Sequence, residues 1–159
     1  MKKVSVMALM IVALGLAWLP SSLSAHCEVP CGIFDDSTRF VMIAEDVKTI
    51  EKAMAEIATL SKAAEPNYNQ IVRWVNTKDE HAQKIIDICS QYFLAQRVKA
   101  VEPADTSFAA YQTKLTLLHQ MIAAAVKTKQ TTDPANAAKI TGLAEKFKTA
   151  YFGAHGHAH

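Results

Sequence analysis

Hydrophobic residues recur every three or four positions through most of the chain, which is the period of an amphipathic helix. Four such stripes lie within residues 40–60, 71–92, 108–126 and 140–151. No segment keeps the strict apolar–polar alternation that a half-buried strand requires. Four helices of roughly 18 to 30 residues with short loops between them predict an all-α fold, an antiparallel four-helix bundle.

Polar residues, prolines and a glycine mark the ends of these predicted helices. Residues 35–37 (Asp-Asp-Ser) are candidate N-caps for the first helix, and Pro66 is expected in the first turn of the second. Asp133-Pro134 begins the fourth helix and Gly153 ends it. The second stripe is interrupted at Thr77-Lys78-Asp79-Glu80, which has the pattern of a capping box and predicts a kinked or split helix.

The first 25 residues have the layout of a secretory signal peptide. Two lysines precede an uncharged apolar run, which ends at Pro20 and leads to Leu23-Ser24-Ala25. The run of about 16 residues is short for a spanning helix, which needs roughly 20. We therefore expect cleavage after Ala25 and an exported protein, periplasmic or secreted. An uncleaved anchor and a cut after Ser24 are alternatives, and a lipid-modified Cys27 is disfavoured because His26 precedes it.

Removal of the leader changes the charge balance of the chain. The leader carries two of the 17 basic residues and none of the 15 acidic ones, so the mature chain is formally neutral. This balance gives no reason to expect nucleic acid as a partner, and none to expect a membrane once the signal is removed. We expect one bundle domain at residues 26–153, followed by a histidine-rich tail at residues 154–159.

Residues 26–31, called the hook below, concentrate metal ligands at the predicted mature N-terminus. Cleavage would give His26 a free amine next to its imidazole, and Cys27 and Cys31 would add two thiols. Amine, amide and thiolate groups from adjacent residues form fused chelate rings that favour planar nitrogen and sulfur ligation. That geometry points to Ni(II) or Cu(II), whereas structural zinc prefers tetrahedral sites. Pro30 stiffens the turn. A Cys27–Cys31 disulfide, which is ordinary in an exported protein, is the alternative.

The segment from His26 to Asp35 resembles the hook of nickel-containing superoxide dismutase, whose pattern is His-Cys-x-x-Pro-Cys-Gly-x-Tyr-Asp. The likeness continues at Arg39-Phe40, at Arg73-Trp74-Val75 and around Tyr92. It implies a four-helix protomer with an N-terminal metal-binding hook, assembled into a homohexamer. It also implies dismutation of superoxide to dioxygen and hydrogen peroxide.

The resemblance further implies which atoms hold nickel. These are the His26 amine, the Cys27 amide nitrogen and the sulfurs of Cys27 and Cys31, with the His26 imidazole as the axial ligand of the oxidised metal. Thiolates and a deprotonated amide would stabilise Ni(III), and the metal would protect the sulfurs from oxidation by the product. Pro30, Phe34 and Tyr92 are the expected neighbours of the ligands.

Two departures from the resembled family are predicted to slow the enzyme. Phe34 stands where the family has a tyrosine, so a hydroxyl beside the open face of the metal is missing. An acid that orients the axial imidazole in the family maps near Val41, which cannot replace it. Tyr92 matches a second family tyrosine near the site.

Other reactive residues have simpler interpretations. Cys89 lies in an apolar stripe and is expected in the core, and His81 and His119 are expected on helix surfaces or in the core. Trp74 and Phe93 are expected to be packing anchors. The alternating tail histidines are either a metal-capture segment or have no function. They are His155, His157 and His159.

These observations predict an exported nickel-dependent superoxide dismutase that cycles between Ni(II) and Ni(III). The first alternative is a non-catalytic protein that stores or hands over nickel through the hook and the tail. The second alternative is a structural helical bundle with an N-terminal disulfide. Bound nickel would separate the structural bundle from the dismutase and the storage protein. Dismutase turnover would then separate the dismutase from the storage protein.

Overall fold

A computed structural model describes residues 34–153 as an all-helical chain. Its elements are α2 (Asp36–Leu60), α3 (Tyr68–Asp87), η1 (Ile88–Arg97), α4 (Phe108–Gln130) and α5 (Ala135–Phe152). Because η1 is a π-helix that continues α3 without a break, residues 34–153 form four long helical segments and no strand. None of the helices in this range is both long and apolar enough to cross a membrane.

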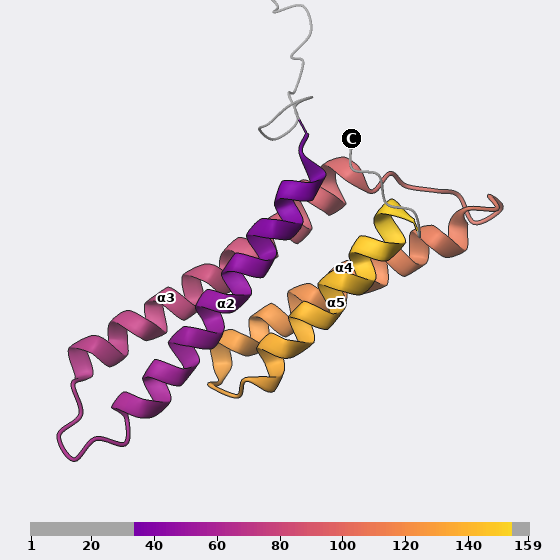
Figure 1. The fold of residues 1–159 in the computed structure, drawn as a ribbon. Helices are drawn as coiled ribbons and strands as arrows, with labels where there is room; N and C mark the ends of the chain where they lie inside the picture. Colours follow the sequence, from indigo (N-terminus) through magenta and orange to yellow (C-terminus); the bar gives the residue numbers. More distant parts are fainter. Residues whose placement is uncertain (1–33, 154–159) are drawn as a thin grey trace, which may run out of the picture.

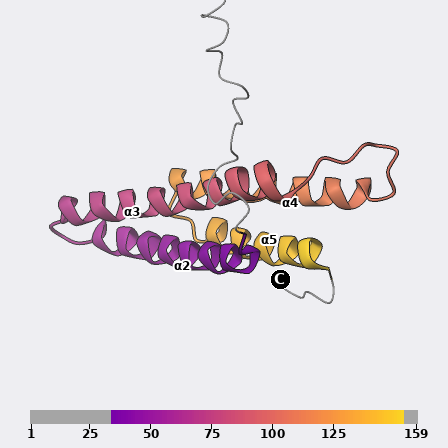
Figure 2. The same ribbon diagram turned by 90° about the horizontal axis from the view of Figure 1, so that it is seen from above.

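The four helical segments run antiparallel to their neighbours in sequence (Figure 1). The view in Figure 2 shows two layers, with α2 beside α5 in one and α3 with α4 in the other. This arrangement confirms the predicted antiparallel four-helix bundle. The signal peptide, the hook and the histidine-rich tail all lie outside the described residues.

The predicted hydrophobic stripes form the core. From α2 the core includes Phe40, Ile43, Val47, Ile50, Met54 and Ile57. Leu60, the last member of that stripe, is only partly buried, since it lies in the last turn of the helix. Burial of a large apolar side chain contributes about 1.5–3 kcal/mol to the free energy of folding. The buried α2 side chains are therefore a major source of the stability of the bundle.

The helix ends also follow the predicted chemistry. The Asp35 carboxylate caps α2 by accepting a 2.9 Å hydrogen bond from the backbone N–H of Thr38. Gly153 ends α5 with a φ of +79°, a value that a residue with a side chain rarely adopts. Pro66 was expected inside the first turn of the second helix, but that helix begins at Tyr68 with Asn67 as its N-cap.

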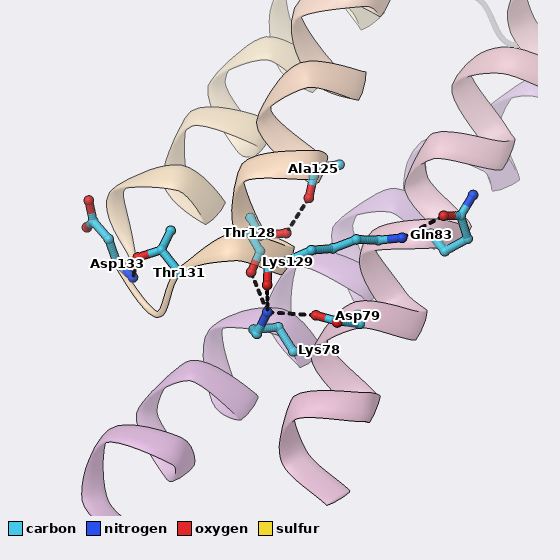
Figure 3. Close-up of polar contacts among 8 residues, drawn as sticks. All are labelled: Lys78, Asp79, Gln83, Ala125, Thr128, Lys129, Thr131 and Asp133. Atoms are coloured by element: carbon cyan, nitrogen blue, oxygen red, sulfur yellow. Dashed lines mark hydrogen bonds and ion pairs between the residues drawn. The ribbon is translucent and has the colours of Figure 1, made fainter. Parts of the chain in front are cut away.

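The predicted break at residues 77–80 is wrong, because α3 runs unbroken through them. The Thr77 hydroxyl donates to the carbonyl oxygen of Arg73 in its own helix and caps nothing. Lys78 is buried, and its ammonium donates to the carbonyl oxygens of Thr128 at 2.6 Å and Lys129 at 2.9 Å (Figure 3). It also pairs with Asp79 at 2.7 Å. The polar interruption therefore caps the end of α4 rather than ending α3.

Aromatic rings fill the end of the bundle at which α2 begins. Phe93 of η1 lies 5.2 Å from Phe40 and 4.9 Å from Phe147, measured between ring centroids. Tyr151 and Phe152 of α5 pack against the same Phe40 ring at 6.2 Å and 5.5 Å. This aromatic packing holds the first turn of α2 against η1 and α5, directly beside residue 34.

Candidate functional site

The expected metal ligands His26, Cys27 and Cys31, and Pro30 between them, lie outside the described residues. The structure instead describes the segment that follows them, beginning at Phe34. Three peptide units separate Cys31 from Phe34, so the Cα atoms of these two residues are within about 11 Å of each other. The bundle end around Phe34 therefore borders the hook, and its side chains form the candidate site.

A single buried carboxylate organises this end of the bundle. Oδ1 of Asp36 accepts hydrogen bonds from the Tyr92 hydroxyl at 2.7 Å and from Nε of Arg97 at 2.8 Å. Oδ2 accepts from the Tyr151 hydroxyl at 2.9 Å and from a terminal nitrogen of Arg97. We call these four residues the Asp36 cluster. It joins the first turn of α2 to η1 and to the last turns of α5.

The electrostatics of the Asp36 cluster keep the carboxylate ionised and both tyrosines protonated. Burial by itself raises the pKa of Asp36, but the hydrogen bonds from Arg97, Tyr92 and Tyr151 outweigh it, so the pKa falls below its usual value. Burial, together with the hydrogen bond to Asp36, raises the pKa of Tyr151 to about 12. The same two causes raise the pKa of Tyr92. Near neutral pH the cluster is therefore a permanent ion pair of Asp36 and Arg97 with two neutral phenols bonded to it.

The π-helical geometry of η1 is what lets two of its residues contact Asp36. Tyr92 and Arg97 are five positions apart. In an α-helix with 3.6 residues per turn, that spacing would turn the two side chains about 140° away from each other. In the wider π turn they lie closer to one face, and both contact the same carboxylate. π-Helical turns are rare and are often found at functional sites.

Phe34 is fixed between two members of this cluster. Its ring meets the Tyr92 ring edge-on with centroids 5.9 Å apart. The Arg97 guanidinium lies over the Phe34 ring at 4.3 Å from the centroid. The structure thus brings together Phe34 and Tyr92, the two described residues that were expected beside the hook.

The sequence also matches a known protein family. The family description of nickel-containing superoxide dismutase matches residues 21–155, which includes the hook and the whole bundle. The chain belongs to the nickel-containing superoxide dismutase family. It is accordingly an enzyme of the superoxide dismutase type with nickel as its cofactor. No curated protein and no solved structure matches the chain.

The donor groups in the hook sequence fit the cofactor of this family. Two thiols, an imidazole and backbone nitrogens are ligand types that suit nickel in a planar arrangement. Between residues 34 and 153 no group of three or more His, Cys, Asp or Glu side chains is positioned to hold a metal ion. The roles of His26, Cys27 and Cys31 as nickel ligands remain predictions from the sequence.

The third cysteine is confirmed as a core residue. Cys89 in η1 is fully buried, and burial raises the pKa of its thiol to about 12. A thiol with such a high pKa is a poor metal ligand and a poor nucleophile. Cys89 is therefore the natural control for experiments on Cys27 and Cys31.

The two predicted departures from the family pattern lie in different surroundings. Phe34 contacts Tyr92 and Arg97, as described above. Val41 is 56% exposed and lines a groove of about 240 Å³ between α2 and α5, together with Glu145 and Lys148. Phe34 contacts Tyr92 and Arg97, and neither of these residues lines the groove beside Val41, so the two departures are tested separately.

Arg39 is a cation beside the site that forms no salt bridge among residues 34–153, and its charge helps to lower the pKa of the exposed Asp35 carboxyl. Its guanidinium lies over the Tyr92 ring at 4.5 Å from the centroid, on the ring that also contacts Phe34. One of its terminal nitrogens donates to the sulfur of Met42 at 3.4 Å. Arg97, by contrast, is neutralised by Asp36.

The other residues considered in the sequence are not members of the Asp36 cluster. Nδ1 of His81 lies 2.7 Å from the buried carboxylate of Asp46, which links α3 to α2. His119 is exposed on α4. Phe93 is confirmed as a core anchor, whereas Trp74 is only partly buried and has the Lys52 ammonium 5.7 Å from its ring centroid.

Sequence reasoning missed the roles of Arg97 and Tyr151. The sequence offers Asp36 as a candidate helix cap, and α-helical periodicity places Arg97 and Tyr92 on different sides of a helix. The sequence does carry one sign of the role of Asp36. Two aspartates precede one helix, and Asp35 alone caps it, so Asp36 is free to bind other side chains.

Proposed function

We propose that the mature chain is an exported superoxide dismutase whose nickel is held by His26, Cys27 and Cys31. The observation that carries this proposal is the hook sequence His-Cys-x-x-Pro-Cys, placed directly before a bundle end with a buried polar cluster. Membership of the nickel-containing superoxide dismutase family supports the metal and the substrate. Cleavage after Ala25 is part of the proposal, because only that cut frees the His26 amine for chelation.

Bound nickel would supply the redox chemistry, alternating between Ni(II) and Ni(III) as one superoxide is oxidised to dioxygen and another, with two protons, is reduced to hydrogen peroxide. The chain supplies the conditions for this cycle. The thiolates of Cys27 and Cys31 and the Cys27 amide would hold the metal and donate the negative charge that Ni(III) needs. The His26 imidazole would be a further nitrogen donor.

The described residues hold the base of the hook and attract the substrate. The Asp36 cluster fixes the first turn of α2, so the chain leaves the bundle at Phe34 in a defined position. The unpaired charge of Arg39 favours approach of an anion to this end. A cavity of about 270 Å³ at the same end adds the cations of Lys99 and Lys114.

Assembly into a homohexamer is also proposed, in line with the family. The support for it is the family membership of the chain. Light scattering of the mature protein at micromolar concentration is expected to give a hexamer. A fully active monomer would contradict this part of the proposal.

The test combines mass measurement, metal analysis and activity. The exported protein should have a mass that begins at His26 and should contain nickel. Cys31→Ser should lose both nickel and dismutation, whereas Cys89→Ser should keep both, because Cys89 is buried in the core. An active protein that still carries Ala25 would contradict the cleavage site. Nickel binding without any turnover would favour the storage alternative.

A further inference from the structure

The cavity of about 270 Å³ next to the Asp36 cluster is lined by an excess of basic side chains, and we call it the basic cavity. Its walls come from the end of η1 and the loop that follows, from the first turns of α4 and from Tyr151 of α5. Arg97, Lys99 and Lys114 line it, and none of its described lining residues is acidic. Ligand pockets usually measure about 300–1,000 Å³, so the basic cavity suits a small ligand.

Lys99 and Lys114 carry charges that the described chain does not neutralise. Neither ammonium forms a salt bridge with a residue in the range 34–153. Lys114 is partly buried, and its ammonium lies 5.7 Å from the centroid of the Tyr151 ring. A charge that is partly removed from water is screened less and gains more from a nearby counter-ion.

The acids that contact the lining of the cavity are already engaged. Asp36 pairs with Arg97 and also accepts the hydrogen bond of the Tyr151 hydroxyl. Oδ1 of Asp105 accepts hydrogen bonds from the backbone N–H and from the hydroxyl of Ser107, each at 2.7 Å. Asp105 is exposed, so water and salt screen its charge. The charges of the two lysines are therefore left for a ligand.

The cavity also offers hydrogen-bond donors of several kinds. Arg97 uses Nε and one terminal nitrogen to bind Asp36, and its guanidinium has further N–H groups, because it carries five in all. Each lysine ammonium has three donors, and the phenol of Tyr111 is another lining group. A ligand that satisfies donors from η1, its following loop and α4 needs several acceptor oxygens. Superoxide has only two oxygen atoms.

We propose that the basic cavity binds a small anion with a phosphate group. A phosphate group carries about two negative charges near neutral pH, which matches the charges of Lys99 and Lys114. Its oxygens are strong acceptors for ammonium, guanidinium and phenol donors, and lysine is a common phosphate-binding residue. Binding itself does not depend on the proposed function, because no residue of the hook takes part in it.

Occupation of the cavity has a consequence for the enzyme, and this consequence rests on the proposed function. The positive potential at this end of the bundle attracts superoxide, and a bound phosphate would cancel the contribution of Lys99 and Lys114. Phosphate should therefore slow dismutation roughly twofold more than chloride at the same low ionic strength.

Calorimetric titration of the mature, nickel-loaded protein with sodium phosphate at pH 8 measures binding directly. Sodium chloride at the same ionic strength is the reference. The site variant carries Lys99→Gln and Lys114→Gln. The control variant carries Lys127→Gln and Lys139→Gln, which change the charge equally at exposed positions near the turn between α4 and α5, at the other end of α4 (Figure 1).

The parent should bind a single phosphate ion per chain, and the site variant should bind it at least about tenfold more weakly. The control variant should bind like the parent, and so should a variant with Lys99→Arg and Lys114→Arg, which keeps both charges. Glycerol 3-phosphate, titrated in parallel, separates the two sources of such a group. Tighter binding than inorganic phosphate would identify an organic phosphate as the ligand, and weaker binding would identify the free ion.

No saturable binding by the parent, or equal losses in the site and control variants, would overturn the site. Pulse radiolysis in phosphate and in chloride then tests the consequence, and the site variant should show the same rate in both salts. Calorimetry needs no turnover. A protein that binds phosphate in the cavity but never dismutates superoxide would therefore overturn the proposed function and leave the anion site standing.

Discussion

Tyr151, in the last turns of α5, donates a 2.9 Å hydrogen bond to Asp36, the first residue of α2. The two residues are 115 positions apart in sequence, and the bond closes the bundle at the end that borders the hook. Through Tyr92 and Arg97 the same carboxylate also holds η1. Three of the four helical segments therefore depend on one side chain for their arrangement around Phe34.

Removal of the Tyr151 hydroxyl should change both the stability and its dependence on pH. Burial and the bond to Asp36 raise the pKa of Tyr151 to about 12, above the value near 10 of an unfolded chain. The stability that the neutral phenol contributes is thus fully present below about pH 10 and is lost as the pH rises through 12. Tyr151→Phe should cost about 1.5 kcal/mol at pH 8 and should weaken this alkaline loss.

Urea unfolding at pH 8 and at pH 11 measures this effect. Tyr68→Phe is the control, because Tyr68 is 72% exposed and its variant should behave like the parent at both pH values. An equal alkaline loss in Tyr151→Phe and in the parent would show that Tyr151 is not the titrating group.

Lys78 is predicted to be a major stabilising residue despite its charge. Lys78→Met would remove three hydrogen bonds and leave the carbonyl oxygens of Thr128 and Lys129 without their donor. We expect a loss of about 2–4 kcal/mol in the free energy of unfolding. Lys84→Met is the control, because the Lys84 ammonium is exposed and its 3.3 Å pair with Glu80 should contribute less than about 0.5 kcal/mol. Similar losses in both variants would contradict the capping role of Lys78.

The helices could be predicted because the residues of one helix face are the ones buried in the core, and they therefore recur every three or four positions in the sequence. Phe40, Ile43 and Val47 recur at helical spacing, and all three are buried. The predicted break near Thr77 was wrong, because Lys78 finds its partners 50 and 51 positions away. A local pattern carries no information on such distant carbonyl groups.

The candidate site was predictable only in part. The hook ligands can be named from the sequence because their chemistry comes from adjacent residues. The Asp36 cluster could not be named, since Arg97 reaches Asp36 only through the π-helical turn of η1. Hydrophobic periodicity at the α-helical spacing does not reveal such a turn.

Arg39 is expected to speed the approach of superoxide. Arg39→Gln removes a positive charge that forms no salt bridge among residues 34–153. It removes the cation over the Tyr92 ring but none of the hydrogen bonds to Asp36. The rate constant per nickel should fall roughly two- to fivefold at low salt, and its salt dependence should become shallower. Pulse radiolysis at several ionic strengths measures both effects, with nickel content determined in parallel. Arg73→Gln, an exposed site on α3, should leave the rate nearly unchanged. A salt dependence identical to that of the parent would contradict a steering role for Arg39.

The final prediction concerns the two departures from the family pattern. Phe34→Tyr would place a hydroxyl on a ring already fixed between Tyr92 and Arg97, next to the hook. Val41→Glu would place a carboxylate in the groove that Lys148 also lines, where an ion pair competes with any interaction with the His26 imidazole. Changes around metal ligands typically alter activity about 10–100-fold. We therefore expect the double variant to turn over faster per nickel than the parent, with most of the gain from Phe34→Tyr.

Superoxide decay after pulse radiolysis, normalised to bound nickel, compares the parent, both single variants and the double variant. Electron paramagnetic resonance of the oxidised enzyme reports the axial imidazole independently of turnover. Phe34→Tyr should raise turnover without changing that signal, because its hydroxyl acts on the anion rather than on the His26 ring. Val41→Glu should strengthen the signal only if its carboxylate reaches His26 in preference to Lys148. A gain in turnover from Val41→Glu alone, with none from Phe34→Tyr, would mean that orientation of the imidazole limits this enzyme rather than placement of its substrate.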